Sequence, residues 1–87
     1  MQADKKQIIR LLNTAKGQIE GIVRMINDDK YCIEISNQIL ASIAILKKAN
    51  IEILEAHLNN CVVNAETFEE RERKMIEVSE ILKKVIK

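Results

Sequence analysis

The sequence predicts an all-α domain with three helices, and three observations support this prediction. Apolar residues make up 47% of the 87 residues, but only one Tyr and one Phe occur, which suits helices packed through aliphatic side chains. The chain has no proline and only two glycines, whereas an all-β fold would need many more turn residues. Apolar positions recur at steps of three and four residues, the spacing of an amphipathic helix. We therefore expect a single helical domain over residues 1–87.

The first helix is expected from about Asp4 to Ile26. Its apolar stripe consists of Ile8, Leu12, Ala15, Ile19, Ile22 and Ile26. Gly17 and Gly21 lie within the helix, where each costs about 1 kcal/mol relative to alanine. We expect these glycines to permit the close approach of another helix. The Asn27-Asp28-Asp29 segment interrupts the periodicity and offers turn and cap chemistry.

The second helix is expected from about Tyr31 to Asn60, and the third from a capping box at Thr67–Glu70 to the C-terminus. The second helix is apolar on nearly all sides, a pattern typical of a helix buried against several neighbours. Its length is unusual for a monomeric domain of this size and favours an oligomer. The third helix carries an apolar stripe of Met75, Val78, Ile81, Leu82 and Val85.

The distribution of charge and the lack of targeting patterns in the sequence reduce the number of functions to consider. Residues 1–50 carry eight Lys/Arg against five Asp/Glu, whereas residues 51–87 carry six against eight, so a DNA surface is expected on the first two-thirds of the chain. The sequence shows neither a signal-peptide pattern nor an apolar run of membrane-spanning length. A cytoplasmic protein without membrane contact is expected, in a compartment where thiols stay reduced. No nucleophile–base set points to an enzyme or to a small-molecule substrate.

His57 and Cys61 form the first candidate for metal chemistry. Their spacing of four residues puts both side chains on one face of a helix, with Cβ atoms roughly 5–6 Å apart. Imidazole plus thiolate suits Cu(I), Zn(II) or Ni(II). By itself, the pair is a weak indication of a metal site and is more often a surface histidine beside a buried cysteine.

Cys32 is the natural third ligand, but the same subunit cannot supply it to this pair. It precedes His57 by 25 residues on one expected helix, a separation of roughly 38 Å at ~1.5 Å per residue. An antiparallel two-fold dimer would bring Cys32 of one chain to the partner's pair and create two equal sites. The second helices would then cross near residues 45–46. Small residues flank that point, namely Ala41, Ala44 and Ala49.

Three ligands with two thiolates favour Cu(I), which accepts low coordination numbers. Zn(II) prefers a fourth ligand, and tetragonal Ni(II) needs more nitrogen ligands than one histidine provides. Tyr31 adjoins Cys32, so it is a candidate for a hydrogen-bonding group around the ligands. An amphipathic residue at a helix start is an equally good interpretation of Tyr31.

The chain resembles the copper-sensing repressor family over nearly its whole length. The matching motifs run from Gly17 to Ile26 (GQIEGIVRMI), then Tyr31-Cys32, then QILA from Gln38, then HLNNCV from His57. The resemblance implies an antiparallel four-helix-bundle dimer, with dimers paired into a homotetramer. It also implies a repressor that occupies operator DNA until its inducer binds.

The resemblance assigns roles to individual residues. Cys32, His57 and Cys61 fall on the Cu(I) ligand positions. Tyr31 and Glu77 fall on positions that hydrogen-bond the non-ligating nitrogen of the histidine. Persulfide-sensing relatives keep both cysteines but typically lack the histidine, so copper is favoured and a persulfide or redox sensor is the alternative.

The basic positions implied to contact DNA are only partly matched. Lys16 and Lys48 correspond to family positions, but Leu11 stands where the family commonly has arginine. Arg10 is one residue away, about 100° around the helix. Weaker DNA binding or a different operator register is therefore expected, and a metal-binding relative that has lost DNA binding remains a further alternative.

Overall fold

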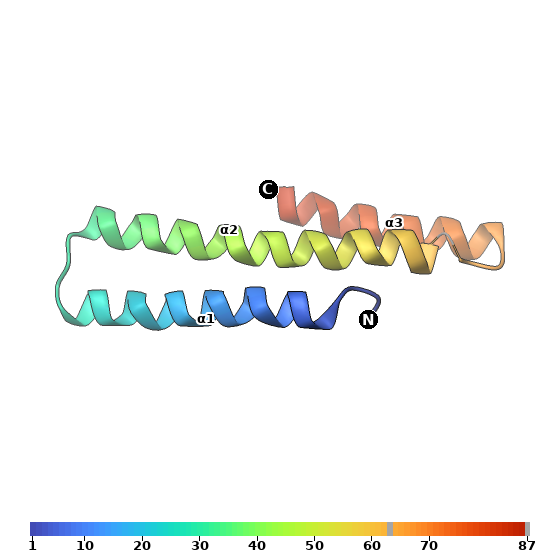
Figure 1. Ribbon diagram of the computed structural model, residues 1–87. Helices are drawn as coiled ribbons and strands as arrows, with labels where there is room; N and C mark the ends of the chain where they lie inside the picture. Colours follow the sequence, from blue (N-terminus) through green and yellow to red (C-terminus); the bar gives the residue numbers. More distant parts are fainter. Residues whose placement is uncertain (63, 87) are drawn as a thin grey trace.

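The computed structural model describes residues 1–62 and 64–86, except for the side chains of residues 61 and 62. The described residues form three α-helices and a short π-helical turn, in the order α1 (Lys5–Asn27), α2 (Cys32–His57), η1 (Leu58–Val62) and α3 (Phe68–Ile86). Figure 1 labels the α-helices along the chain. The described part contains no strand. The predicted all-α class and three-helix protomer are confirmed. The protomer is elongated, with principal extents of 56 × 27 × 12 Å.

Both ends of α1 have clear local causes. Asp4 is the N-cap, and its carboxylate accepts hydrogen bonds from the backbone N–H groups of Lys6 and Gln7 at 3.0 and 3.3 Å. At the other end, Asp29 has a left-handed φ of 52°, and the N–H of Lys30 donates to the carbonyl of Met25 at 3.0 Å. This is a Schellman-type end in which an aspartate takes the usual place of glycine. It turns the chain sharply into α2.

α1 and α2 pack side by side as an antiparallel hairpin (Figure 1). The buried residues of α1, Ile8, Ala15 and Ile22, are spaced by seven and form one seam. The Ser42 hydroxyl of α2 is buried and lies 3.0 Å from Oε1 of Gln18. Because a buried polar group must be hydrogen-bonded, this contact sets the register of the hairpin.

The two glycines of α1 do not serve the packing of this hairpin. A Cβ added at Gly17 would meet no atom within 4 Å, and one at Gly21 would meet only the side chain of Arg24 at 3.6 Å. The expectation that they permit a close helix approach is therefore wrong for the protomer. Both glycines lie outside the α1–α2 seam, because the neighbouring helix packs on the side marked by Ile8, Ala15 and Ile22.

The second helix ends earlier than the sequence predicts. α2 stops at His57, and η1 replaces the expected α-helical turn through Asn60. The Asn60 side-chain amide donates to the carbonyl of Ala56 at 2.9 Å, which supplies a partner to a carbonyl near the end of the regular helix. Single π-helical turns within longer helices occur frequently at functional sites.

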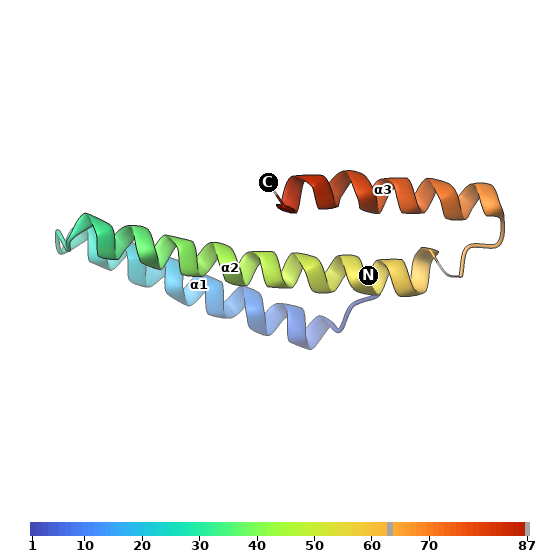
Figure 2. The same cartoon turned by 90° about the horizontal axis from the view of Figure 1, so that it is seen from above.

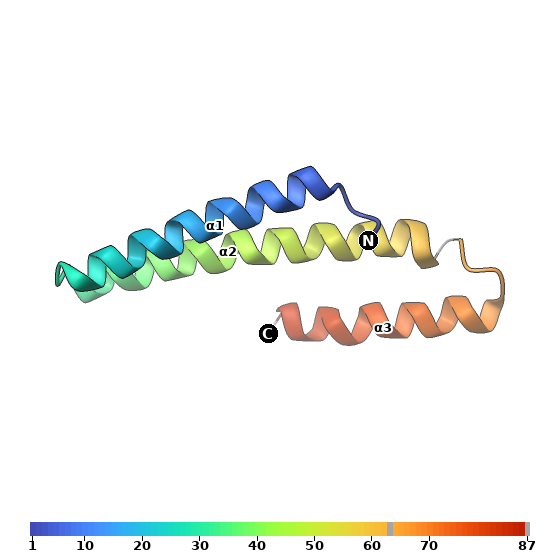
Figure 3. The same cartoon turned by 90° about the horizontal axis from the view of Figure 1, so that it is seen from below.

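α3 begins at a cap close to the predicted one. Thr67 Oγ1 accepts from the Glu70 N–H at 3.1 Å, but the Glu70 carboxylate returns to the N–H of Glu66 rather than to that of Thr67. The hydrogen bond and charge of Lys74, followed by the bond from Glu66, hold the pKa of Glu70 below its ordinary value of 4.5. Figures 2 and 3 show α2 lying between α1 and α3. Leu54 of α2 and Val78 of α3 are buried.

Much of the apolar surface is uncovered in the single protomer. On α2 only Ser42, Ala49 and Leu54 are buried, so the expectation of a helix buried on all sides is not met within one chain. None of the described helices is long and apolar enough to span a membrane. Contiguous exposed apolar faces of this kind mark interaction surfaces.

Candidate metal centre and DNA surface

Cys32 is the first residue of α2 and carries a free, exposed thiol. Tyr31 occupies the N-cap position but makes no side-chain cap hydrogen bond, and its side chain is 66% exposed. Both residues therefore lie at one end of the hairpin, next to the turn after α1. Their exposure leaves them accessible to a second molecule.

His57 is the last residue of α2 and is half-buried. Cys61 falls within η1, but its side chain lies outside the described residues, so the shared face of His57 and Cys61 stays a prediction. Among the described residues, no three His, Cys, Asp or Glu side chains gather in a way that could hold a metal ion. Cys32 and His57 are the two ends of a 26-residue helix, which separates them by roughly 38 Å.

His57 shares a small cavity with Glu77 of α3. The cavity has a volume of about 240 Å³, and its other lining residues are apolar: Ile53, Leu54, Val78 and Ile81. The structure thus places Glu77 beside His57, although the residues are twenty positions apart in sequence. Tyr31, the other residue expected near His57, lies at the opposite end of α2.

A stripe of exposed apolar residues runs along the full length of α2 into η1. It consists of Ile33, Leu40, Ile51 and Leu58, whose side chains are 53%, 60%, 40% and 39% exposed. The four residues are spaced by seven, eleven and seven positions. Each of these spacings brings a side chain to within about 20° of the direction of the previous one around the helix. We call these four residues the α2 stripe. The sequence carried this signal, but only the structure shows that neither α1 nor α3 covers it.

The basic residues assigned to DNA binding lie near one another along the hairpin. Arg10, Lys16 and Lys48 are all exposed. The contact between Gln18 and Ser42 puts Lys48 at the level of the α1 segment between Arg10 and Lys16. The three residues therefore span roughly 9 Å along the hairpin axis at 1.5 Å per residue.

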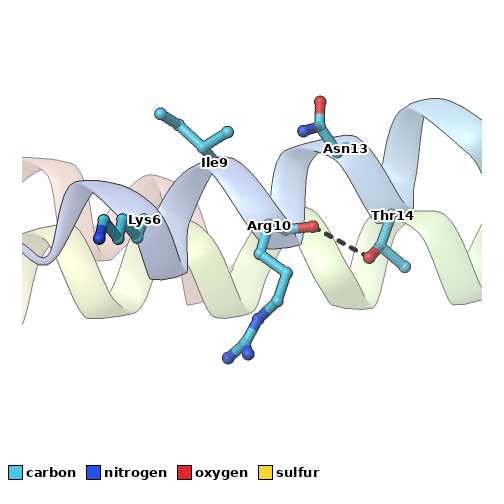
Figure 4. Close-up of a pocket in the computed structure, with 5 residues that line it drawn as sticks. All are labelled: Lys6, Ile9, Arg10, Asn13 and Thr14. Atoms are coloured by element: carbon cyan, nitrogen blue, oxygen red, sulfur yellow. Dashed lines mark hydrogen bonds between the residues drawn. The ribbon is translucent and has the colours of Figure 1, made fainter.

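Figure 4 shows a shallow groove on α1 that includes Arg10 and two polar residues that sequence reasoning missed, Lys6 and Asn13. The Thr14 hydroxyl donates to the Arg10 carbonyl at 2.9 Å (Figure 4), and the Arg10 guanidinium hydrogen-bonds the side chain of Gln7. A net positive charge and hydrogen-bond donors on an exposed helix face suit contact with phosphates.

Leu11 has a different environment from Arg10. It is half-buried, on the side of α1 that continues the seam toward α2. The aliphatic residue at this position therefore contributes to the hairpin, while the adjacent Arg10 is exposed. This explains structurally how the position can be apolar while a basic group remains one residue away.

Comparisons with known proteins agree with this architecture. The chain matches the family of metal-sensitive transcriptional repressors over residues 4–84. It is 34% identical, over 97% of its length, to the copper-sensing transcriptional repressor CsoR of Bacillus subtilis, of which it covers 83%. It is 39% identical, over 70% of its length, to the copper-sensing repressor RicR of Mycobacterium tuberculosis, of which it covers 64%.

Solved structures show the same fold. The crystal structure of the copper-sensing repressor CsoR with Cu(I) from Geobacillus thermodenitrificans has a TM-score of 0.83 and 31% identity, over 100% of this chain and 94% of that one. The nickel-responsive regulator InrS has a TM-score of 0.78 and 25% identity, over 98% and 96% of the two chains. The fold, the length of the match and the sequence identity agree, and the chain belongs to the family of metal-sensitive transcriptional repressors, which are regulators rather than enzymes.

Proposed function

We propose that this protein is a Cu(I)-responsive transcriptional repressor that binds operator DNA without metal and leaves it when Cu(I) binds. Cys32 of one subunit, together with the partner subunit's His57 and the partner subunit's Cys61, would hold the metal. The names of its relatives support copper as the signal. The observation that carries the proposal for the site is the arrangement of the α2 stripe.

The α2 stripe is symmetric about its own midpoint. Ile33 and Leu58 are equally far from residues 45–46, and so are Leu40 and Ile51. An antiparallel α2 pair in this one register therefore matches Ile33 with the partner subunit's Leu58 and Leu40 with the partner subunit's Ile51. Such a two-fold contact is self-complementary.

The same register brings the metal ligands together. Cys32 precedes Ile33 by one residue, and His57 precedes Leu58 by one residue. Because equal edges of two identical antiparallel helices meet, Cys32 and the partner subunit's His57 lie on the same edge of the outermost apolar pair. The crossing point at residues 45–46 is the one expected from the ligands alone, although the apolar stripe is an independent observation. The two ligand-bearing ends are identical by symmetry, which gives two sites in each dimer.

The free energy of dimerisation indicates that α1 also contributes apolar surface to this interface. Full burial of a large aliphatic side chain stabilises by about 1.5–3 kcal/mol, so covering the exposed half of eight stripe residues contributes about 8 kcal/mol. Association costs about 4–15 kcal/mol. The dimer thus needs more apolar surface, and α1 offers Leu12, Ile19 and Ile26, which are 45%, 47% and 54% exposed. Covering them as well closes the two hairpins into a four-helix bundle.

The donor set fits Cu(I) better than Ni(II). Two thiolates and one imidazole are soft ligands in a low number, which Cu(I) accepts. The chain contains one histidine and two cysteines, so nitrogen ligands for a tetragonal Ni(II) site are missing from its sequence. The exposed thiol of Cys32 is available to ions in solution, and bound Cu(I) would link the two subunits.

The DNA surface is proposed on α1 and the neighbouring part of α2. Arg10, Lys16 and Lys48 would contact phosphates, with Lys6 from the adjacent groove. These contacts position the protein on DNA and make its affinity depend on salt. A repressor of this kind works where operator DNA is located, which in a bacterial cell is the cytoplasm.

Glu77 is proposed to couple the two sites. Glu77 lines the same cavity as His57, so its carboxylate could accept a hydrogen bond from the imidazole nitrogen that is not needed as a ligand. That bond would draw α3 toward α2. Metal and DNA then oppose each other through one coupling free energy, which acts reciprocally.

A subunit-mixing experiment tests the shared site. A Cys32→Ala chain and a His57→Ala/Cys61→Ala chain each lack ligands for both sites of their own homodimers. Their heterodimer keeps one complete site, so an equimolar mixture should bind one Cu(I) per heterodimer with wild-type affinity. Each variant alone is the matched control. Weak Cu(I) binding by the mixture, at a concentration where heterodimers are demonstrated, would show that the ligands do not come from two subunits.

Because the Cys32 thiol is exposed, thiol oxidation is the second candidate for the signal that releases the protein from DNA. An accessible cysteine that faces a second cysteine across an interface can be cross-linked by a persulfide or oxidant. His57→Ala separates the two functions, because it should strongly weaken Cu(I) binding and leave thiol chemistry intact. If persulfide releases DNA from both the wild type and His57→Ala, while Cu(I) does not release it from the wild type, the copper proposal is wrong.

A further inference from the structure

The outer face of α1 carries two arginines with a glycine midway between them. Arg10, Gly17 and Arg24 are spaced by seven residues, so each lies within about 20° of the previous one around the helix. We call these three residues the α1 line. Gly17 is about 160° around the helix from Ala15, which is buried in the seam with α2. The α1 line therefore faces away from the rest of the protomer.

The proposed dimer does not cover the α1 line either. The residues of α1 proposed for that interface, Leu12, Ile19 and Ile26, are each at least about 140° from Gly17 around the helix. A Cβ added at Gly17 would meet no atom within 4 Å. Glycine inside a helix is less stable than alanine, and neither the protomer nor the proposed dimer gains a contact in return. Glycine is also typical of positions where a ligand approaches the backbone closely.

The two arginine side chains leave the backbone at Gly17 uncovered. The Arg10 guanidinium hydrogen-bonds the side chain of Gln7, so it is turned toward the N-terminal end of α1. The Arg24 guanidinium lies 3.6 Å from the position that a Cβ on Gly21 would take, so it folds back over Gly21. An open stretch of helix backbone thus lies between two cationic residues, which are roughly 21 Å apart along α1 at 1.5 Å per residue.

The charge of this face suits a polyanion. α1 contains five Lys or Arg residues and one acidic residue, Glu20. Lys6, Arg10 and Arg24 form no ion pair with any residue that the structure describes, although Glu20 is only four residues from Arg24. Lys6 is about 40° from Arg10 around the helix and widens the basic face. Cations beside accessible helix backbone fit a row of phosphates.

We propose that the sugar–phosphate backbone of double-stranded DNA lies along the α1 line, with one strand against the helix backbone at Gly17 and its phosphates held by Arg10 and Arg24. This inference rests on the proposed DNA-binding function. It adds Arg24 as a phosphate contact and Gly17 as the point of closest approach. The arginines supply the charge, and the glycine lets the strand come within their reach.

Fluorescence anisotropy of a short labelled DNA duplex of mixed sequence measures these contacts, because phosphate contacts supply essentially all of the affinity for DNA that lacks an operator. Arg24→Ala should lower the slope of log affinity against log salt by about one. Arg73→Ala is the matched control, because it removes the same charge from an exposed position on α3, which α2 separates from α1 (Figures 2 and 3). It should leave the slope unchanged.

Gly17→Leu should weaken duplex binding about tenfold or more, because the added side chain holds the strand away from both arginines. Gly17→Ala should weaken binding less, and it should unfold at a higher urea concentration than the wild type, since alanine favours the helix and its Cβ meets no atom. Asn64→Leu is the matched control for an added leucine, because Asn64 is exposed in the loop before α3. Circular dichroism and sedimentation verify that each variant keeps its helices and its oligomeric state.

The double variant Gly17→Leu/Arg24→Ala distinguishes a lost contact from a general disturbance. If the leucine already holds the strand away from Arg24, removing that arginine should cost much less affinity in the Gly17→Leu background than in the wild type. Additive losses, or a Gly17→Leu variant that binds DNA like the wild type, overturn the proposal. A Gly17→Ala variant that unfolds more easily than the wild type also overturns it, because the glycine would then serve the fold or the assembly.

The outcomes separate this inference from the proposed function. A wild type that does not bind the duplex even at low salt refutes DNA binding together with the α1 line. A wild type that binds the duplex, while Arg24→Ala and Gly17→Leu bind it equally well, refutes the α1 line alone.

Discussion

Leu40 offers the sharpest test of the α2 dimer, because its side chain is 60% exposed in the protomer. Leu40→Ala should therefore barely affect the hairpin, whereas it removes a large side chain from the proposed interface. Covering the exposed part of Leu40 is worth about 1–2 kcal/mol, from about 1.5–3 kcal/mol for full burial. Symmetry doubles the loss to about 2–4 kcal/mol, which raises the dissociation constant roughly 30- to 1000-fold at 1.4 kcal/mol per factor of ten.

Sedimentation equilibrium over a concentration series measures this effect directly. Ile9→Ala is the matched control, because Ile9 is 55% exposed but lies roughly 60–100° around α1 from the face of Leu12, Ile19 and Ile26 that is proposed to join the interface. Cu(I) affinity, measured by competition with a chelator, should fall for Leu40→Ala at low protein concentration and recover at high concentration. If Leu40→Ala dimerises like the wild type, or Ile9→Ala is equally weakened, the register through residues 45–46 is wrong.

Three further predictions concern the coupling, the DNA surface and pH. Glu77→Ala should bind Cu(I) almost as tightly as the wild type but lose most of the metal-induced decrease in operator affinity, measured by fluorescence anisotropy; full release by Cu(I) would exclude Glu77 from the coupling. Arg10→Ala should weaken operator binding and lower the slope of log affinity against log salt by about one, whereas Lys30→Ala, at the far turn, should change neither; equal slopes would remove Arg10 from the surface. Glu70 has a lowered pKa, so its stabilising effect is present above pH 4.5 and is lost as pH falls through the folded-state pKa. The difference in unfolding free energy between wild type and Glu70→Gln, measured in urea, should therefore shrink between pH 7 and pH 3; a constant difference would contradict this role.

Local rules account for the parts of the fold that the sequence could predict. Helical periodicity specifies three helices, and the capping box at Thr67–Glu70 marks the start of the third, because hydrogen bonds within a helix and at its caps are local. The end of α2 could not be predicted in the same way. A π-helical turn after His57 differs from an α-helical turn in that each hydrogen bond spans five residues and not four, and a five-residue segment is too short for the spacing of its apolar side chains to reveal this difference.

The candidate site, like the fold, has some features that the sequence could predict and others that it could not. The separation of Cys32 from His57 follows from the sequence, because a continuous helix has a fixed rise per residue. The need for a second subunit to complete the proposed site follows from that same distance. Tyr31 was a candidate because it adjoins Cys32 in sequence. The role of Glu77 could not be worked out in this way, because it depends on a contact between distant segments, and only the family resemblance suggested it.

By itself, the sequence determined the helices, the candidate metal ligands and the distance that separates Cys32 from His57, because each follows from rules that act within a few residues or along one helix. Only the tertiary structure decided which apolar residues stay uncovered and which polar residues become neighbours. It placed Glu77 and His57 at the edge of one shared cavity and left the α2 stripe exposed. The physical reason is that burial depends on how whole helices pack, and an apolar side chain has the same period along a helix whether it faces its own chain or another.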